Sequence, residues 1–398
     1  MNKRKNKRGI INRYLDKYFN YPEKNNQFNI YLFLSILALS FVGLLVLFSA
    51  SSYLTIKYDT STYHFVLRQA MFLTVGLVVM IISSKLSYKF YKDHAKILYI
   101  IGIILLIMVY IPGIGNFEKG ARRSVNLGIT FMPSDIAKFT SVVFLAKYLI
   151  DNRKTMYKFM EGFFYPVLII IFPFLLIAMQ TDLSTSIVVF VSLSLVYLIG
   201  GFNSKFMPIL ISGGVLLLIL IIFGLKDYQI ARITGFLNPE ADYQNQTWQV
   251  LNGLFAVSRG GIIGQGYGKS IYKYGYLSDE VSNDMIFSVI GEEFGFLGSV
   301  LFLILVCTIT YLIIKTAIQS KDLFAKLLVF GISMVYALQS FINIGVSLSL
   351  IPNTGINLPM VSNGGTSLVA FCFMFGVVLN VSRYNNENKQ RDKSRKRI

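Results

Sequence analysis

Long uninterrupted apolar runs constrain this chain more strongly than any other feature of its sequence. The runs are about 17 to 25 residues long, the length that a helix needs to cross a lipid bilayer. Only 15% of the residues are charged, whereas soluble domains carry about 25%. A soluble enzyme, a disordered chain and a disulfide scaffold are therefore excluded. We predict an all-α polytopic membrane protein with ten transmembrane helices, at residues 29–50, 66–84, 95–113, 135–150, 163–180, 183–201, 206–225, 285–314, 323–347 and 357–381.

The formal net charge of +18 is distributed unevenly along the chain. If both termini are cytoplasmic, the cytoplasmic segments hold 27 Lys/Arg and 8 Asp/Glu, whereas the rest of the chain holds 11 and 12. Cytoplasmic loops of membrane proteins carry an excess of Lys and Arg. We therefore predict an N-in/C-in protein of the cytoplasmic membrane, with no nucleic-acid partner. The cytoplasmic segments are 1–28, 85–96, 147–161, Lys205, 315–326 and 382–398.

Three regions follow from this topology. Residues 1–28 and 382–398 form basic cytoplasmic tails, and residues 29–381 form the membrane domain. Its longest connection, 226–284, lies on the extracytoplasmic side and is far longer than an ordinary loop. This connection contains Trp248, eight tyrosines and phenylalanines, and a glycine-rich run at 260–268. Because this content is unlike that of a disordered linker, we predict a folded re-entrant or cap-like segment.

Charged residues within or at the ends of the apolar runs are few. Each is a candidate functional residue, because a charge inside a membrane is expensive to bury. They lie in the outer half of the predicted spans or just within it, which predicts a polar chamber that opens outward rather than a continuous pore. They are Arg68, Asp135, Lys138, Asp182, Asp284, Glu292 and Glu293.

Structural roles compete with functional ones at these positions. Asp135 and Lys138 are three residues apart and can form an ion pair on one face of a helix. Asp182 begins an apolar run, where a carboxylate can cap the helix N-terminus. Glu292 and Glu293 follow Asp284 by about two helical turns, so they return to roughly the same face. One of them can hold a helix end while the other faces a cavity.

Asp284 joins the long polar connection to an apolar helix. A capping role is possible there too. A carboxylate at the mouth of an outward chamber is nevertheless well placed to act as a general base. Arg122, Arg123, Arg232 and Arg259 add cations on the same side, and guanidinium groups match the oxygens of a diphosphate. The glycine run has no Walker-type Lys-Ser/Thr after it, so we do not expect ATP binding.

Seven segments, taken in order, resemble motifs of the SEDS family, whose members include FtsW, RodA and SpoVE. For example, residues 180–185 (QTDLST) resemble the family's QPDLGT, and residues 283–295 (NDMIFSVIGEEFG) resemble TDFIFAxIGEELG. The chain departs from the family at Ser124, Met132, Asp135, Thr181, Ser184, Met360 and Asn363. Residues 48–51 and 65–69 are closer to FtsW and SpoVE than to RodA. The matching segments are 119–123, 132–138, 180–185, 232–246, 260–268, 283–295 and 352–367.

This resemblance implies a peptidoglycan glycosyltransferase that polymerises lipid II at the outer membrane face and releases undecaprenyl diphosphate with inversion, for septal wall synthesis. It implies that Asp284 is the catalytic base, with or without Mg²⁺ or another divalent cation near the diphosphate. The residues expected to bind substrate or diphosphate are Arg122, Arg123, Lys138, Arg232 and Arg259. The supporting polar residues are Asp135, Asp182, Glu292, Glu293 and Ser362.

The resemblance also implies partners: a class B penicillin-binding transpeptidase and other divisome proteins. Three alternatives remain open at this point. One is a lipid II flippase, which predicts charged residues continuing through the inner half of the membrane. Another is a RodA-like polymerase for cell elongation. The third is a scaffold with a vestigial chamber, which the joint presence of Arg122, Arg123, Lys138 and Asp284 argues against.

Overall fold

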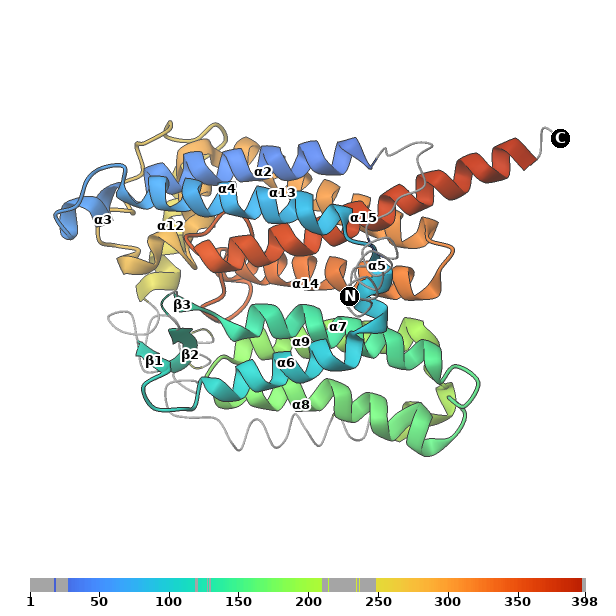
Figure 1. The fold of residues 1–398 in the computed structure, drawn as a ribbon. Helices are drawn as coiled ribbons and strands as arrows, with labels where there is room; N and C mark the ends of the chain where they lie inside the picture. Colours follow the sequence, from blue (N-terminus) through green and yellow to red (C-terminus); the bar gives the residue numbers. More distant parts are fainter. Residues whose placement is uncertain are drawn as a thin grey trace, which may run out of the picture.

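A computed structural model describes residues 18, 28–118, 121–126, 128, 130–209, 214, 234, 236 and 248–395 of the 398-residue chain. Long helices run side by side through the molecule, and a small β-sheet lies at one end (Figure 1). We call this end the sheet end. The opposite end, where the last helix projects beyond the bundle, is called the tail end.

The helices pack in two groups (Figure 1). In the first, α4 (His64–Lys85) runs along α15 (Gly365–Arg395), and α13 (Ile286–Gln319) contacts both α2 (Ile30–Ala50) and α14 (Leu323–Ser347). The second consists of α6 (Ala95–Met108), α7 (Pro133–Asp151), α8 (Tyr165–Met179) and α9 (Leu183–Gly201), with α14 packed against α7 and α9. Short helices α3 (Ser52–Lys57), α5 (Tyr88–Asp93) and α12 (Trp248–Gly260) lie between the long ones, with one-turn segments at Met160–Phe164, Ser204–Phe206 and Ser278–Ser282.

Local sequence determines where several helices begin. The side chain of Asn29 caps α2 by accepting a hydrogen bond from the N–H of Leu32 at 3.2 Å, and Asp322 caps α14 in the same manner. Pro133 occupies the first turn of α7, where its missing N–H is not needed. Large apolar side chains stay exposed around the bundle, as at Phe41 and Leu301. Lipid acyl chains would cover such a surface, in agreement with a multi-pass membrane protein.

The predicted spans agree with the helices at most positions. Seven helical segments in the described part of the chain are long and apolar enough to cross a membrane. Helix α6 is shorter than its predicted span of 95–113, and α7 occupies the predicted span 135–150. The predicted span 206–225 falls mostly outside the described residues. The total of ten spans therefore stays a prediction.

Two predicted spans need correction. The span expected from residue 357 begins as a helix only at Gly365, because residues 352–364 form a partly buried, non-helical loop with prolines at 352 and 359. Helix α13 extends to Gln319 rather than 314, and it is broken at Gly295, whose backbone has φ 65° and ψ −163°. Irregular backbone inside a membrane protein has to be covered by protein or water.

The all-α prediction was incomplete at the sheet end. Strands β1 (Gly115–Glu118), β2 (Ala121–Asn126) and β3 (Thr130–Phe131) form an antiparallel sheet in that order, with Gly115 opposite Val125 and Val125 opposite Phe131. Such short, polar strands leave no clear alternation of apolar and polar residues for sequence reasoning to detect.

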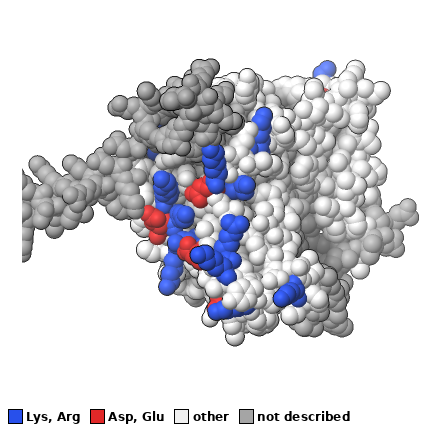
Figure 2. All heavy atoms as spheres, turned by 90° about the vertical axis from the view of Figure 1, so that its right-hand side faces the viewer, with Lys and Arg blue, Asp and Glu red and all other residues white. Residues whose placement is uncertain are grey.

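Lys and Arg side chains gather on the face at the tail end, with fewer Asp and Glu among them (Figure 2). The predicted cytoplasmic connections 85–96, 147–161 and 315–326 all join helices at this end (Figure 1). The sheet end, by contrast, holds α12, which belongs to the described part of the long connection.

Candidate functional site

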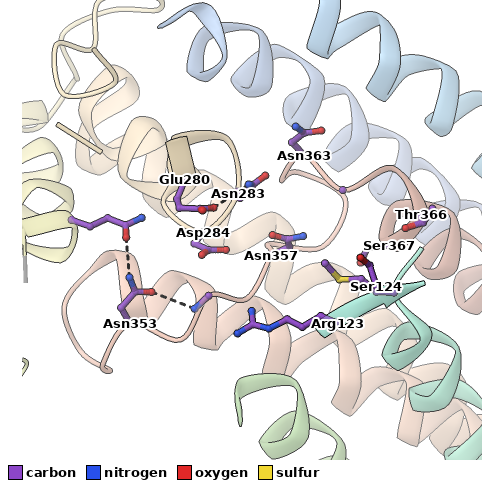
Figure 3. Close-up of a pocket in the computed structure, with 14 residues that line it drawn as sticks. Arg123, Ser124, Glu280, Asn283, Asp284, Asn353, Asn357, Asn363, Thr366 and Ser367 are labelled. Atoms are coloured by element: carbon purple, nitrogen blue, oxygen red, sulfur yellow. Dashed lines mark hydrogen bonds between the residues drawn. The ribbon is translucent and has the colours of Figure 1, made fainter. Parts of the chain in front are cut away.

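A polar cavity of about 380 Å³ lies at the sheet end, where four parts of the chain meet. Strand β2 contributes Arg123, and the start of α13 contributes Asp284 (Figure 3). The loop 352–364 and the start of α15 form much of the remaining wall. The lining residues are Arg123, Ser124, Met132, Gln249, Glu280, Asn283, Asp284, Asn353, Gly355, Asn357, Asn363, Gly364, Thr366 and Ser367.

Loop 352–364 holds the backbone around Asp284 in place. The N–H of Asn363 donates to the carbonyl of Ser282 at 2.8 Å, and the Ser362 hydroxyl donates to the carbonyl of Asn283 at 2.5 Å. On α14, the Asn343 side chain donates to the carbonyl of Asp284 at 3.0 Å. Three consecutive carbonyls are therefore fixed. Ser362 does not line the cavity, so its supporting role is to position the backbone beside Asp284.

Side chains of α14 hold part of the loop itself. The Gln339 side chain donates to the carbonyl of Asn357 at 3.1 Å, and Asn343 donates to that of Ile356 at 2.7 Å. These hydrogen bonds satisfy backbone groups that no helix or strand satisfies. The loop can therefore remain irregular although Ile356 and Leu358 are buried.

Asp284 and Arg123 face the same small space beside Gly355 (Figure 3). An added Cβ at Gly355 would lie 3.5 Å from Oδ2 of Asp284 and 3.8 Å from Nη1 of Arg123. Gly355 has φ +69°, a conformation that favours glycine. Glycine at this position therefore leaves room between the carboxylate and the guanidinium. A proton donor can approach the carboxylate there, and an anionic group can approach the guanidinium.

One nitrogen of the Arg123 guanidinium is hydrogen-bonded to the backbone, whereas another lacks a partner among the described residues. Its Nη2 donates to the carbonyl of Thr181 at 2.7 Å, and its Nε is buried without a hydrogen-bond partner among the described residues. Thr181 has φ +60° in the tight turn before α9. The carboxylate of Asp182 accepts from the N–H of Thr185 at 3.1 Å, which confirms its predicted capping role. Asp182 does not line the cavity.

Asp135 and Lys138 form the predicted ion pair, at 2.8 Å. Lys138 also donates to Oε1 of Gln339 at 2.7 Å and is only 2% exposed. It does not line the cavity. Through Gln339, which also holds Asn357, Lys138 is connected to the cavity loop rather than to the cavity itself.

Arg259, Glu292 and Glu293 form a separate cluster. Arg259 pairs with Glu292 at 2.6 Å, and Glu293 pairs at 3.0 Å with the buried Lys273. None of the four lines the cavity. The prediction that the charged residues share one chamber was therefore wrong. Glu292 and Glu293 do follow Asp284 by two turns, but they face the outer segment 268–273.

Arg122 and Arg68 are exposed, and Arg232 lies outside the described residues. The sequence reasoning missed Lys273 and the polar but uncharged lining of the cavity. A search for charge alone could not find the amides, although five Asn or Gln side chains line the cavity: Gln249, Asn283, Asn353, Asn357 and Asn363. Glu280 was also missed, and its carboxylate accepts from Asn283 at 3.1 Å.

An apolar groove of about 680 Å³ adjoins the cavity. The two share Met132 and Thr366 as lining residues. The rest of the groove is built mainly from aliphatic and aromatic side chains of α4, α7 and α15, including Phe72, Phe139 and Phe373. A single molecule with a polar head and a long apolar chain could occupy both spaces.

The fold and the site define a multi-pass helical membrane protein with a polar cavity at one end that continues into an apolar groove. Residues 29–387 match the family described as "Cell cycle protein", which comprises FtsW, RodA and SpoVE. The chain belongs to this family.

Individual relatives agree with this assignment. Stage V sporulation protein E of Bacillus subtilis is 35% identical over 86% of this chain and 94% of its own length. A protein of Coxiella burnetii named "Probable peptidoglycan glycosyltransferase FtsW" is 32% identical over 89% of this chain and 95% of its own.

Solved structures share the fold. A chain from a peptidoglycan synthase complex, described as coordinating polymerization and crosslinking, matches with a TM-score of 0.74 and 26% identity, over 90% of this chain and 98% of that one. The rod shape determining protein RodA of Thermus thermophilus matches with a TM-score of 0.65 and 24% identity, over 89% of this chain and 97% of that one.

Proposed function

We propose that this protein polymerises lipid II into glycan strands at the outer face of the cytoplasmic membrane, with Asp284 as the general base. The observation that carries the proposal is the placement of Asp284 and Arg123 on the same small space in a polar cavity. The prediction of a SEDS-family peptidoglycan glycosyltransferase is confirmed for the family and the enzyme class. The substrate, the roles of the residues and the orientation are proposals.

The distribution of charge supports the outward orientation. Basic side chains gather at the tail end (Figure 2), and the positive-inside rule assigns such an end to the cytoplasm. The cavity lies at the opposite end, next to the sheet. Helix α2 begins and α15 ends at the tail end, which supports both termini being inside.

Asp284 would remove the proton from the 4-hydroxyl of the acceptor GlcNAc. The resulting oxygen attacks C1 of the donor MurNAc from the face opposite the diphosphate. As the new C–O bond forms, the bond from C1 to the diphosphate oxygen breaks, and undecaprenyl diphosphate leaves with its electron pair. The configuration at C1 is therefore inverted. Asp284 carries the proton until solvent takes it.

Arg123 would stabilise the departing diphosphate. Its Nη1 faces the space beside Gly355 while its Nη2 is bound to Thr181, so the guanidinium is oriented before substrate arrives. Donors that are fixed in advance stabilise developing negative charge without reorganising. Mg²⁺ binds proteins through one or two carboxylates together with substrate phosphates. Glu280 lines the cavity and would be the residue to hold it, and the ion would neutralise charge on the diphosphate while Asp284 stays available as the base.

The remaining lining suits a sugar with an apolar lipid anchor. Neutral amides such as Asn357 and Asn363 can donate to and accept from sugar hydroxyl and acetamido groups. The adjoining groove offers an apolar path for the polyprenyl chain, which starts from the shared residues Met132 and Thr366. Lys138, by contrast, would position the cavity loop through Gln339 instead of binding the diphosphate.

A structural relative coordinates polymerization with crosslinking in a complex. This supports a class B penicillin-binding transpeptidase as the partner of the present chain. The FtsW name of several relatives supports a role in septal wall synthesis together with other divisome proteins.

Replacing Asp284 by Asn tests the mechanism. The amide keeps the shape of the side chain but cannot accept the acceptor's proton, so glycan formation from lipid II in proteoliposomes should fall at least about 1,000-fold. Asp151→Asn is the matched control, because Asp151 is a half-exposed residue paired with Lys147, remote from the cavity lining. A fluorescent lipid II assay run in parallel distinguishes polymerisation from translocation. Normal polymerisation by the Asp284→Asn protein would contradict the proposal.

A further inference from the structure

The break in α13 is closed by another part of the chain. At Gly295 the helix loses its own hydrogen bonds, and segment 261–266 replaces them. The N–H groups of Gln265 and Gly266 donate to the carbonyls of Glu292 and Glu293, both at 3.0 Å. In return, the N–H groups of residues 296 and 297 donate to the carbonyls of residues 261 and 262, at 2.8 and 3.0 Å.

The approach at this break requires two glycines. A Cβ at Gly264 would lie 2.2 Å from the carbonyl oxygen of Glu293, and one at Gly295 would lie 2.3 Å from the amide nitrogen of Gly264. Both residues also have positive φ angles, +84° and +65°. The first part of α13, residues 286–294, is thus a separate half-helix with segment 261–266 packed into its end.

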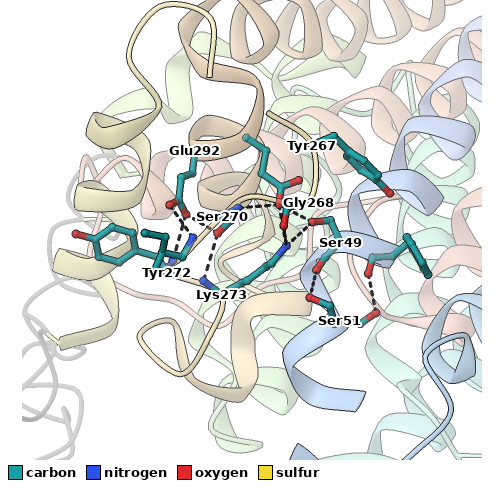
Figure 4. A network of polar contacts seen from close by, with 12 residues as sticks. Ser49, Ser51, Tyr267, Gly268, Ser270, Tyr272, Lys273 and Glu292 are labelled. Atoms are coloured by element: carbon teal, nitrogen blue, oxygen red, sulfur yellow. Dashed lines mark hydrogen bonds and ion pairs between the residues drawn. The ribbon is translucent and has the colours of Figure 1, made fainter. Parts of the chain in front are cut away.

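Buried side chains reinforce the same connection (Figure 4). Glu292 accepts hydrogen bonds from Arg259, from the hydroxyl of Ser270 and from the N–H groups of Ile271 and Tyr272. The next residue, Glu293, accepts one from the N–H of Ser270 at 3.3 Å. Two adjacent carboxylates of the half-helix therefore bind four consecutive residues, 270–273, of the outer connection.

Lys273 is the centre of this cluster. Its side chain is 1% exposed, and its Nζ donates to Oε1 of Glu293 at 3.0 Å, to the carbonyl of Gly268 at 2.8 Å and to Oγ of Ser49 at 2.9 Å. The Ser49 hydroxyl in turn donates to Glu293 at 2.5 Å. Ser49 belongs to α2. All three ammonium protons are therefore satisfied, and three separate parts of the chain meet at one ion pair.

We propose that Lys273 is a positioning residue for the reaction, an inference that rests on the proposed function. Lys273 does not line the cavity. It fixes the far end of the half-helix 286–294, and Asp284 lies two residues before the near end. A helix is stiff over this length. If the end at Glu293 is free to move, Asp284 is therefore displaced with it. A misplacement of about 1 Å at a catalytic group lowers rates substantially.

Charge pairing gives a specific way to test this. Lys273→Met leaves a buried carboxylate without its cation. This destabilises the protein far more than a buried neutral pair does. The polymerisation kcat of that variant should therefore fall by about tenfold or more, with little change in KM. The double variant Lys273→Met/Glu293→Gln removes both charges and should recover most of the lost kcat. Lys269→Met, an exposed lysine of the same segment, is the matched control.

Hydrogen exchange gives a readout that does not depend on catalysis. Amides of residues 264–273 and 284–294 should exchange faster in Lys273→Met, and return toward the wild-type rate in the double variant. If Lys273→Met does not fold, Glu293→Gln replaces it as the single variant, because it leaves Lys273 buried without an anion.

Two results would overturn the inference. One is a single variant that matches wild type in both kcat and exchange. The other is a loss of kcat that the double variant does not recover, because Lys273 would then act by itself. Failure of the proposed function is distinguishable, since in that case wild-type protein makes no glycan while the exchange measurement still tests the connection to Asp284.

Discussion

The cavity and the Lys273 cluster differ in how their charged side chains are buried and what surrounds them. In the cluster, Lys273, Glu292 and Glu293 are almost completely buried and paired with protein groups. In the cavity, Asp284 and Arg123 are half-buried and point at the same space beside Gly355. Charges that the protein satisfies hold the fold together. Charges that line a cavity are the ones that can act on a substrate.

Arg123→Lys should give the largest effect of three further substitutions. Lysine cannot keep both the hydrogen bond to Thr181 and a donor at the cavity, because it lacks the planar fork of arginine. The polymerisation kcat should fall by about 100-fold, measured with lipid II in proteoliposomes. Arg153→Lys, in the connection between α7 and α8, is the control. Activity within twofold of wild type would show that the cavity does not use the guanidinium.

Gly264→Ala should act on the other region and destabilise the protein. The new Cβ combines an unfavourable φ with a collision against the carbonyl of Glu293, and such strain costs about 2 kcal/mol. Gly268→Ala is the matched control, because Gly268 also has a positive φ but open space around its Cβ. Thermal denaturation in detergent should show a clearly lower midpoint for Gly264→Ala. Equal midpoints would mean that the stability of the protein does not depend on the close approach of segment 261–266 to the carbonyl of Glu293.

Arg259→Gln should give the smallest effect. The Arg259 side chain is 34% exposed although Glu292 is buried, and a glutamine amide can still donate a hydrogen bond to that carboxylate. Glu292 also keeps its hydrogen bonds from Ser270, Ile271 and Tyr272. Both the denaturation midpoint and the polymerisation rate should stay close to wild type. A large loss of polymerisation with an unchanged midpoint would indicate that Arg259 contacts the substrate instead.

Periodicity and charge predicted much of this molecule. Apolar runs located most of the helices, because membrane spans need long apolar segments, and the ion pair of Asp135 with Lys138 followed from their spacing. The cap at Asp182 followed from its place before an apolar run. Family motifs identified Asp284 and Arg123, which the structure brings to one cavity.

The remaining features depend on contacts between distant parts of the chain. Lys273 is far in sequence from Ser49 and its environment gives no local signal, so its burial could not be predicted. The loop 352–364 was assigned partly to a helix because its apolar residues resemble a span. Side chains of other helices, such as Gln339 and Asn343, satisfy its backbone groups and let it stay irregular.

That loop has a consequence for how the cavity can change during evolution or design. The wall beside Asp284 has no regular structure of its own, and part of its shape comes from two side chains on α14. Substitutions at Gln339 or Asn343, neither of which lines the cavity, would therefore remodel it. New sugar preferences could arise from within the helix bundle, while every residue that touches the substrate stays the same.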